Sequence, residues 1–241
     1  MADEKLIKSN ERVKEHGEVF TPKRVVDVML NQPELKGELH SLTATFLEPA
    51  AGEGAFLTEI LSRKLVVAEK LSDSIIEFEN NALTALTSLY GIELLTDNTE
   101  LLVTHMYHVF YQKYTQQLGK YKSRENKKVE KSASTIIKAN MVQGDALTGK
   151  NKNGNEIVFS RWIFLKDKND IRKVRRTEYT LKSIEEDGPS LDGLSHGNKA
   201  EELTLFEVDE PGNSHANYRY SVVSLFDVYK ETKVTIPQKF D

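Results

Sequence analysis

Cysteine is absent from the 241 residues, which excludes disulfides, thiolate zinc sites and cysteine nucleophiles. The absence also fits a reducing cytoplasm. No apolar run approaches the roughly 18 residues of a membrane span, and the N-terminal MADEKLIKSN lacks an apolar signal core. The six histidines show no paired spacing of metal ligands. We therefore expect a soluble cytoplasmic protein without a metal site.

A large excess of one charge sign is also missing, because 33 basic residues stand against 37 acidic ones, a net charge of −4. This balance argues against a chain that coats itself uniformly with nucleic acid. The charge is nevertheless segregated: residues 120–182 hold 17 basic and 7 acidic residues, whereas residues 183–215 hold 1 and 9. The acidic segment is rich in glycine, proline and serine, and we expect a mobile loop there.

Strand and helix patterns alternate along the middle of the chain. Residues 43–48 and 88–94 have strand composition, and a helical spacing of apolar residues follows each of them. The run STIIKANMVQGDAL gives a third short element that ends in Gly144-Asp145. Alternation of this kind predicts an α/β fold with a doubly wound, mostly parallel sheet and helices on both faces.

The chain divides into three parts by texture. Residues 1–16 form a polar N-terminal arm, residues 17–148 hold the alternating strands and helices, and residues 149–241 form a β-rich appendage that contains the acidic loop. Within the second part, Thr21-Pro22 predicts a helix over about 22–31. The threonine hydroxyl would cap its first turn, and proline is tolerated at the first helical position.

The most informative segment is FLEPAAGEGAFL at 46–57, which places Gly52 and Gly54 between a predicted strand and a predicted helix. Glycines at this point let the backbone pass close to a ligand and adopt dihedrals that other residues avoid. Open α/β sheets bind their ligands at the carboxyl ends of the strands. An ordinary tight turn is the alternative for a glycine pair taken alone.

Carboxylates end the next two predicted strands. Glu93 ends the second strand in LYGIEL, where a doubly wound fold places an acceptor for ribose hydroxyls. Asp145 ends the third strand in NMVQGDAL and could accept from the exocyclic amine of an adenine ring. A solvated strand end and a turn are the respective alternatives. Three consecutive strand ends with such signals indicate a nucleotide-like site.

Four motifs in order carry a specific resemblance: GEVFTP at 17–22, FLEPAAGEGAFL at 46–57, YGIEL at 90–94 and QGDAL at 143–147. Together they resemble the opening of the adenine-N6 DNA methyltransferases of restriction-modification systems, especially type I modification subunits. The resemblance covers about residues 17–148 and implies a Rossmann-like methyltransferase fold that binds S-adenosylmethionine.

The resemblance also implies a role for each residue of the cofactor site. Phe20, Thr21 and Pro22 would close over the methionine end, with Thr21 near its carboxylate. Residues of the glycine loop would lie beneath the cofactor, Glu93 would hold the ribose and Asp145 the adenine amine. The loop residues are Glu48, Ala50, Gly52 and Gly54. Ile92 and Leu94 are candidate apolar contacts of the adenine ring, with a plain core role as the alternative.

One part of the family pattern is missing. These enzymes hold the target amine with an Asn/Asp-Pro-Pro-Tyr/Phe motif whose ring stacks on the flipped base, and this chain contains no Pro-Pro pair. The catalytic residues are therefore unknown. Only residues 149–241 follow the resemblance, which leaves little room for a target-recognition domain. A second protein subunit would supply these elements.

A run of basic residues near Trp162 and Tyr179 could contact DNA phosphates. Its members are Lys166, Lys168, Arg172, Lys173, Arg175 and Arg176. A solvated charged hairpin is the alternative.

The sequence thus favours a component of an S-adenosylmethionine-dependent DNA methyltransferase from a restriction-modification or phage-defence system. A non-catalytic subunit that senses S-adenosylmethionine or holds an assembly together is the alternative. A methyltransferase of RNA or protein has no positive feature beyond the fold. A dinucleotide-dependent oxidoreductase is disfavoured because no third glycine follows Gly52-x-Gly54 at the required spacing.

Overall fold

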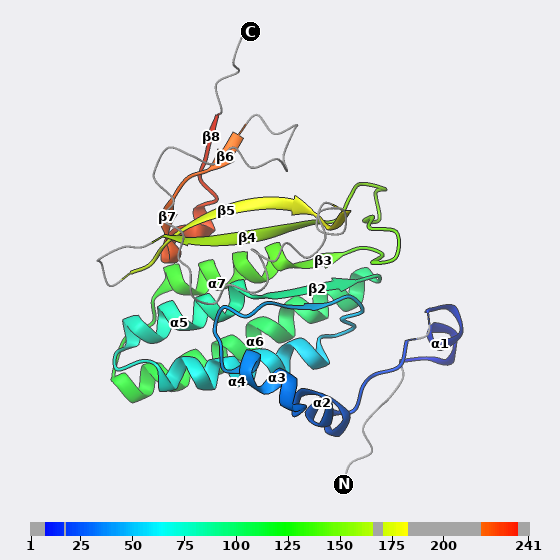
Figure 1. The fold of residues 1–241 in the computed structure, drawn as a ribbon, viewed down its shortest axis with the longest axis horizontal. Coiled ribbons are helices and arrows are strands. Elements are labelled where there is room, and N and C mark those ends of the chain that lie inside the picture. The colour runs from blue at the N-terminus through cyan, green and yellow to red at the C-terminus, as the bar shows by residue number, and fades with distance from the viewer. Residues whose placement is uncertain (1–7, 17, 166–170, 183–217, 236–241) are drawn as a thin grey trace.

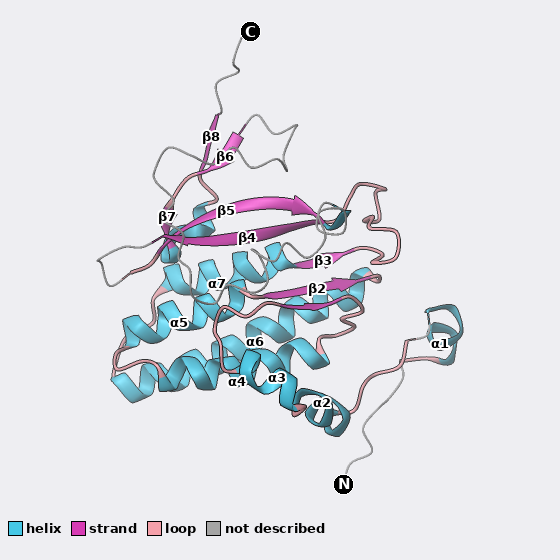
Figure 2. Ribbon diagram, viewed as in Figure 1, coloured by secondary structure: helices cyan, strands magenta, loops and turns pink. Residues whose placement is uncertain are grey.

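A computed structural model describes residues 8–16, 18–165, 171–182 and 218–235. The expected acidic loop at 183–215, and residues 1–7 of the expected N-terminal arm, lie outside the described residues. Helices are cyan and strands magenta in Figure 2. No helix in the described part of the chain has the length and apolar composition needed to cross a bilayer.

Three short helices precede the first strand: α1 (Asn10–His16), α2 (Lys23–Leu30) and α3 (Pro33–Leu39). The expected start of α2 is wrong in detail, because Pro22 occupies the N-cap position with φ −59° and ψ 145°, and no side chain caps the helix. The extended ψ places Pro22 outside the helix, so Thr21 lies one residue too early to cap the first turn. Val26 and Leu30 of α2 are buried, and α2 contacts the helix that follows the glycine loop.

The centre of the fold is a parallel sheet of three strands, β1 (Phe46–Glu48), β2 (Leu89–Glu93) and β3 (Met141–Gln143), in the order β1-β2-β3. Its register pairs Glu48 with Gly91 and Glu93 with Gln143. The three strands therefore finish at one side of the sheet, which we call the carboxyl edge. The expectation of a mixed α/β protein with a parallel sheet is confirmed.

Two helices form each connection between successive parallel strands. α4 (Ala55–Lys70) and α5 (Ile75–Thr87) join β1 to β2, and α6 (Thr96–Tyr121) and α7 (Lys127–Asn140) join β2 to β3. Ser74 caps α5 by accepting from the Glu77 amide, and Asn126 caps α7 by accepting from the Lys128 amide. The caps explain why each second helix begins where it does.

The third predicted element is partly wrong, because the first half of STIIKANMVQGDAL is the end of α7 and only Met141–Gln143 is strand. Buried side chains on α7 recur at helical spacing, and the cap at Asn126 sets the helix start upstream of the run. The buried positions are Val129, Ser132, Ala133, Ile136, Ile137 and Asn140. The isoleucines therefore pack on a helix face.

A second, antiparallel sheet contains β4 (Val158–Leu165), β5 (Lys173–Thr180) and β7 (Val223–Ser224), followed by the 3-10 helix η1 (Leu225–Lys230). β6 (Tyr218–Tyr220) pairs with β8 (Lys233–Thr235). Figure 1 shows β4 and β5 beside the parallel sheet, on the side away from α4 and α6.

Helices were expected on both faces of the parallel sheet, and here the structure differs. The ring of Tyr90 on β2 meets Phe159 of β4 edge-on at 5.6 Å, and the Tyr90 hydroxyl donates to the Ser160 carbonyl at 3.0 Å. On the opposite face, a Cβ added to Gly91 would lie 2.8 Å from Leu57 of α4. One face therefore packs on helices, and the other packs on β4 at this point.

Candidate functional site

The carboxyl edge brings together the three strand ends that the sequence singled out. The Gly52 amide of the glycine loop donates to Glu93 Oε2 at 2.8 Å, and the Gly144 amide donates to the Glu93 carbonyl at 2.9 Å. Glu93 is therefore bonded on one side to the loop after β1 and on the other to the turn after β3. Asp145 is the next residue of that turn and directly follows Gly144 in the chain.

The glycine loop has a backbone that requires glycine. Gly52 and Gly54 both have positive φ, of 54° and 95°. A Cβ added to Gly54 would lie 2.6 Å from Leu102 Cδ1 of α6, so a side chain there would displace Leu102 as well as strain the backbone. The Ala51 amide donates to the Ile92 carbonyl at 2.9 Å, which fixes the loop against β2.

Glu93 is buried, at 7% exposure, and its carboxylate accepts three hydrogen bonds from surrounding donors. Oε2 accepts from the Gly52 amide, while Oε1 accepts from the Leu95 amide at 3.0 Å and from Asn98 Nδ2 at 3.2 Å. A carboxylate offers roughly four acceptor positions. The side chain is thus held in one orientation and retains capacity for one further donor, such as a hydroxyl.

Asp145 shapes its own turn. Its amide donates to the Lys150 carbonyl at 2.8 Å, and its Oδ1 accepts from the Leu147 amide at 2.9 Å. Adding a Cβ to Gly144 would bring it within 2.7 Å of two Ile157 carbons. The turn that holds Asp145 at the carboxyl edge is therefore closely packed. The alternative given for Asp145, a structural role in a turn, is present in the structure.

The two apolar candidates beside Glu93 have different positions. Ile92 is 1% exposed and lies in a core cluster with Ile157 and Phe159. Leu94 is 48% exposed at the carboxyl edge. The core alternative therefore holds for Ile92, and Leu94 is the one available to a ligand.

The residues that precede α2 reach the glycine loop through Lys8. Lys8 Nζ lies 2.7 Å from a Glu53 carboxylate oxygen and 5.9 Å from the centroid of the Phe20 ring. Thr21 and Pro22 follow and are half-buried. Lys8 thus contacts both Phe20 and Glu53, which places Phe20 near the glycine loop.

Glu48 and Ala50 lie at the entry to the glycine loop. The Ala50 amide donates to Glu48 Oε1 at 3.3 Å, and Ala50 is exposed. The Glu48 carboxylate therefore bonds to the backbone of its own loop, and the loop is exposed to solvent at Ala50.

An ion cluster at the carboxyl edge was missed by sequence reasoning. Arg12 contacts Glu18 through two hydrogen bonds and Asp97 through two more. The hydrogen bonds from Arg12 hold the pKa values of Glu18 and Asp97 below their usual range, and those from the two carboxylates raise the pKa of Arg12. Arg12 and Asp97 lie 85 residues apart in the chain, so no local pattern marks this pair.

Two of the six basic residues expected to contact DNA are bonded to other residues of the chain. Arg172 donates to Thr84 Oγ1 at 2.7 Å and to Asn81 Oδ1 at 2.8 Å, and burial lowers its pKa. Arg176 lies 5.5 Å from the Trp162 ring and 4.7 Å from the Tyr220 ring. Lys166 and Lys168 lie outside the described residues. Lys173 is exposed and Arg175 half-buried on β5. Arg172 and Arg176 are thus hydrogen-bonded to other groups of the chain, and the contact of this run with DNA stays a prediction.

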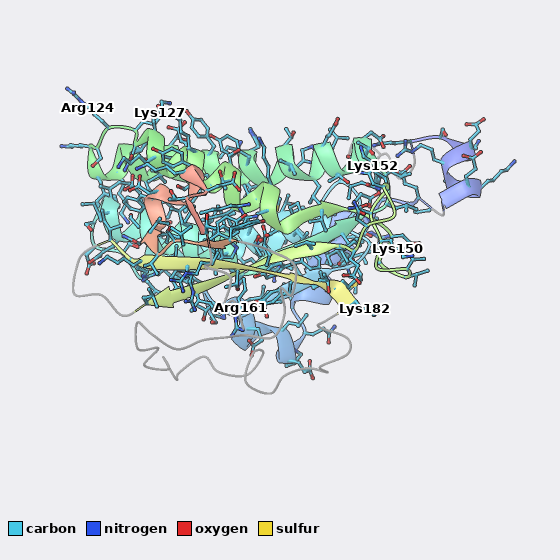
Figure 3. All side chains as sticks on the ribbon, turned by 90° about the horizontal axis from the view of Figure 1, so that it is seen from above. Arg124, Lys127, Lys150, Lys152, Arg161 and Lys182 are labelled. Atoms are coloured by element: carbon cyan, nitrogen blue, oxygen red, sulfur yellow. The ribbon has the colours of Figure 1, made fainter. Side chains whose placement is uncertain are left out.

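Two other basic side chains lie closer to the site. Lys150 and Lys152 are exposed on the turn between β3 and β4, five and seven residues after Asp145. Figure 3 shows both, with Lys182, at the end of the molecule where α1 lies, whereas Arg124 and Lys127 lie at the far end. The charge run at 120–182 gave no means of distinguishing these ends.

A cavity of about 720 Å³ is lined by none of the expected cofactor residues. It is formed by Ile76, Glu79, Asn126, Lys128, Ile171, Lys173, Ser224, Phe226 and Asp227. These residues belong mainly to α5, α7, β5 and η1, so the cavity is separate from the carboxyl edge.

No group of three or more His, Asp or Glu side chains that could hold a metal ion occurs within the described ranges. Comparisons with protein-family models, with curated proteins and with solved structures found no match.

Proposed function

We propose that this chain is the cofactor-binding component of an S-adenosylmethionine-dependent adenine-N6 DNA methyltransferase of a restriction-modification or phage-defence system. One observation carries the proposal: a glycine loop with two positive-φ residues is hydrogen-bonded to the strand-end carboxylate Glu93, with the Gly144-Asp145 turn on the other side. The proposal includes a doubly wound Rossmann-like methyltransferase fold with a β-rich appendage.

The residues at the carboxyl edge fit the parts of S-adenosylmethionine. The buried Glu93 carboxylate has an acceptor position for a ribose hydroxyl, and the exposed Leu94 offers an apolar surface for the adenine ring. Gly52 and Gly54 leave the loop without side chains where the ligand would pass. The bound cofactor would supply the methyl group on its sulfonium, and the protein's part would be positioning.

The acceptor half of the reaction is assigned to a partner subunit. The chain lacks the Pro-Pro motif that would hold the target amine. In the described part of the chain, β1 also pairs with β2 alone, so its outer edge carries no strand. Lys150 and Lys152 are the basic side chains that we assign to DNA phosphates near the site.

The absent acceptor motif also favours a second candidate, a subunit that binds S-adenosylmethionine as a sensor or as part of an assembly and transfers no methyl group. It uses the same pocket and shares every contact described above. The two candidates differ only in turnover.

The test is calorimetric titration of the chain with S-adenosylmethionine, followed by transfer of a tritiated methyl group to unmethylated DNA. The Gly52→Asp/Gly54→Asp variant should lose binding. The matched control for the titration is Gly154→Asp, because Gly154 has a positive φ of 78° with nothing within 4 Å of an added Cβ but lies outside the carboxyl edge.

Three outcomes are distinct. Binding with transfer by the chain alone would establish a methyltransferase whose acceptor residues are unlike the known motif. Binding without transfer would support the component and sensor candidates, which transfer assays with added partner subunits then separate. Absence of binding would refute the proposal.

A further inference from the structure

Asn98 lies in the first turn of α6 and joins two carboxylates that the chain brings from different regions. It is 1% exposed. Its Nδ2 donates to Glu18 Oε1 at 2.7 Å and to Glu93 Oε1 at 3.2 Å. The side chain therefore connects the residue proposed to hold the ribose with the segment that precedes α2.

The other end of the Asn98 amide accepts from cations of the N-terminal segment, which we define as residues 8–16 and 18–22. Its Oδ1 accepts from Lys8 Nζ and from Arg12 Nη2, the latter at 3.3 Å. An amide both donates and accepts, whereas a carboxylate of the same shape only accepts and repels other carboxylates. The environment of Asn98, two carboxylates on one side and two cations on the other, therefore requires an amide.

From these contacts we infer that Asn98 is a positioning residue that couples cofactor binding to docking of the N-terminal segment. This inference rests on the proposed function, because Glu93 is its link to the cofactor. Asn98 orients Glu93 Oε1 for the ribose, and the same Nδ2 group holds Glu18. A bound ribose that fixes Glu93 also fixes Asn98, and so favours the docked position of Glu18, Arg12 and Lys8.

Coupling of this kind is reciprocal. If the cofactor stabilises the docked segment by some factor, then the docked segment raises the cofactor affinity by the same factor. Lys8 adds a second link, since its Nζ lies 2.7 Å from Glu53 of the glycine loop. The segment therefore contacts the site from two sides.

The test measures both sides of the coupling. Amide hydrogen exchange of the peptide that covers residues 8–18 reports docking, and calorimetric titration with S-adenosylmethionine reports affinity. In the wild-type chain, saturating cofactor should slow exchange of this peptide about fivefold or more, in line with ordinary coupling energies.

Asn98→Asp keeps the shape of the side chain and removes its donor. We expect faster exchange at residues 8–18, an affinity about tenfold lower, and no effect of saturating cofactor on exchange. A merely structural role would not abolish that cofactor dependence. Circular dichroism checks that the variant folds.

Arg12→Ala keeps the inference falsifiable if Asn98→Asp does not fold, because it leaves Asn98 and Glu93 intact. It should lower the cofactor affinity by the same factor by which the cofactor protects the segment. Lys14→Ala is the matched control, as Lys14 is an exposed residue of the same helix, and it should leave both readings unchanged.

The failures are distinguishable. Wild-type binding without any change in exchange at residues 8–18, or an Asn98→Asp protein that keeps the cofactor dependence, overturns the inference and leaves the proposed function standing. Unchanged affinity in Arg12→Ala has the same meaning. A wild-type chain that binds no S-adenosylmethionine overturns the inference together with the proposed function.

Discussion

The carboxyl edge and the antiparallel sheet both enclose charged side chains, and they use them in opposite ways. At the carboxyl edge, Glu93 accepts from two backbone amides and a side-chain amide, and keeps an acceptor position for another donor. In the antiparallel sheet, Arg176 lies between the rings of Trp162 and Tyr220 and donates to protein oxygens. The Glu93 carboxylate can take up a further donor from a ligand, whereas the Arg176 guanidinium is bonded to Ser160, Glu178 and Glu231 of the protein.

This difference shows that a charge run in a sequence does not reveal which charges are available. The basic run that includes Arg172 and Arg176 predicts a DNA surface, yet both guanidinium groups donate hydrogen bonds to other side chains of the protein. Substitutions at the carboxyl edge should therefore change binding with little effect on stability. Substitutions in the antiparallel sheet should do the reverse.

The largest expected effect is on binding at the glycine loop. Gly52→Asp should lower S-adenosylmethionine affinity at least about 100-fold, or about 2.7 kcal/mol, because its charged side chain would occupy the space beside the loop through which the cofactor would pass. Its cost in folding free energy should be only about 1 kcal/mol from the positive φ, since nothing lies within 4 Å of an added Cβ.

Gly154→Asp is the control for this prediction, because it adds a similar backbone strain away from the site. It should cost a similar folding free energy in urea unfolding and leave titration with the cofactor unchanged. Equal affinities for the two variants would contradict the assignment of the loop.

The next effect is on stability at Arg176. Removing its side chain in Arg176→Ala deletes two cation–π contacts and leaves Ser160 Oγ and Glu231 without their donor. We expect unfolding to become easier by about 3 kcal/mol, with cofactor affinity unchanged within about twofold. Urea unfolding followed by fluorescence of Trp162, the single tryptophan, measures the loss of stability. A cofactor affinity that falls together with the stability would contradict the separation of binding and stability between the two regions.

A buried cation at the other end of the parallel sheet makes a prediction about pH. Lys64 is fully buried, donates to the Ala44 carbonyl and to Ser88 Oγ, and burial lowers its pKa to about 7 from 10.5. Between these two values the unfolded chain holds the proton that the folded chain releases, so stability rises with pH. The slope contributed by Lys64 should reach about 1.4 kcal/mol per pH unit.

Urea unfolding of the wild type and of Lys64→Met from pH 7 to 10.5 checks this sign. The methionine has no proton to release, so the variant should lack this part of the slope. Identical slopes in the two proteins would show that Lys64 stays charged in the fold.

The smallest effect concerns docking of the N-terminal segment. Its ion pairs join partly exposed side chains such as Arg12 and Asp97, so about 1 M salt, with a Debye length of roughly 3 Å, should speed hydrogen exchange in α1. The pKa values of Glu18 and Asp97 are lowered from their usual 4.5 and 3.8. Docking should therefore be lost when the pH falls below these values and acid protonates the two carboxylates. The global free energy of unfolding should change by less than about 1 kcal/mol. Exchange in α1 that ignores salt would contradict these contacts.

Much of the parallel sheet and the glycine loop could be predicted, because their signals are local. Gly52 and Gly54 sit between a strand and a helix in the sequence as they do in the fold, and Glu93 ends its strand as expected. The error at α7 arose because Ile136 and Ile137 have strand composition, while the buried positions that recur along the helix override it.

The rest of the site depends on contacts that no local pattern contains. Asn98 meets Glu18 and Lys8 across 80 and 90 positions of the chain. The Tyr220 ring that contacts Arg176 belongs to β6, which follows the acidic segment in the chain. Such partners are set by the packing of whole elements, so only the structure reveals which charges are engaged and which face a ligand.

The most direct test of the central claim is residue-resolved. The chain has 13 glycines, so glycine-selective ¹⁵N labelling gives an amide spectrum that can be assigned by substitution. On titration with S-adenosylmethionine, the Gly52 and Gly54 signals should shift in a saturable way, with Gly144 following, while Gly37 and Gly154 stay in place. No shift at Gly52 and Gly54 under saturating cofactor, or a shift confined to other glycines, would contradict the account.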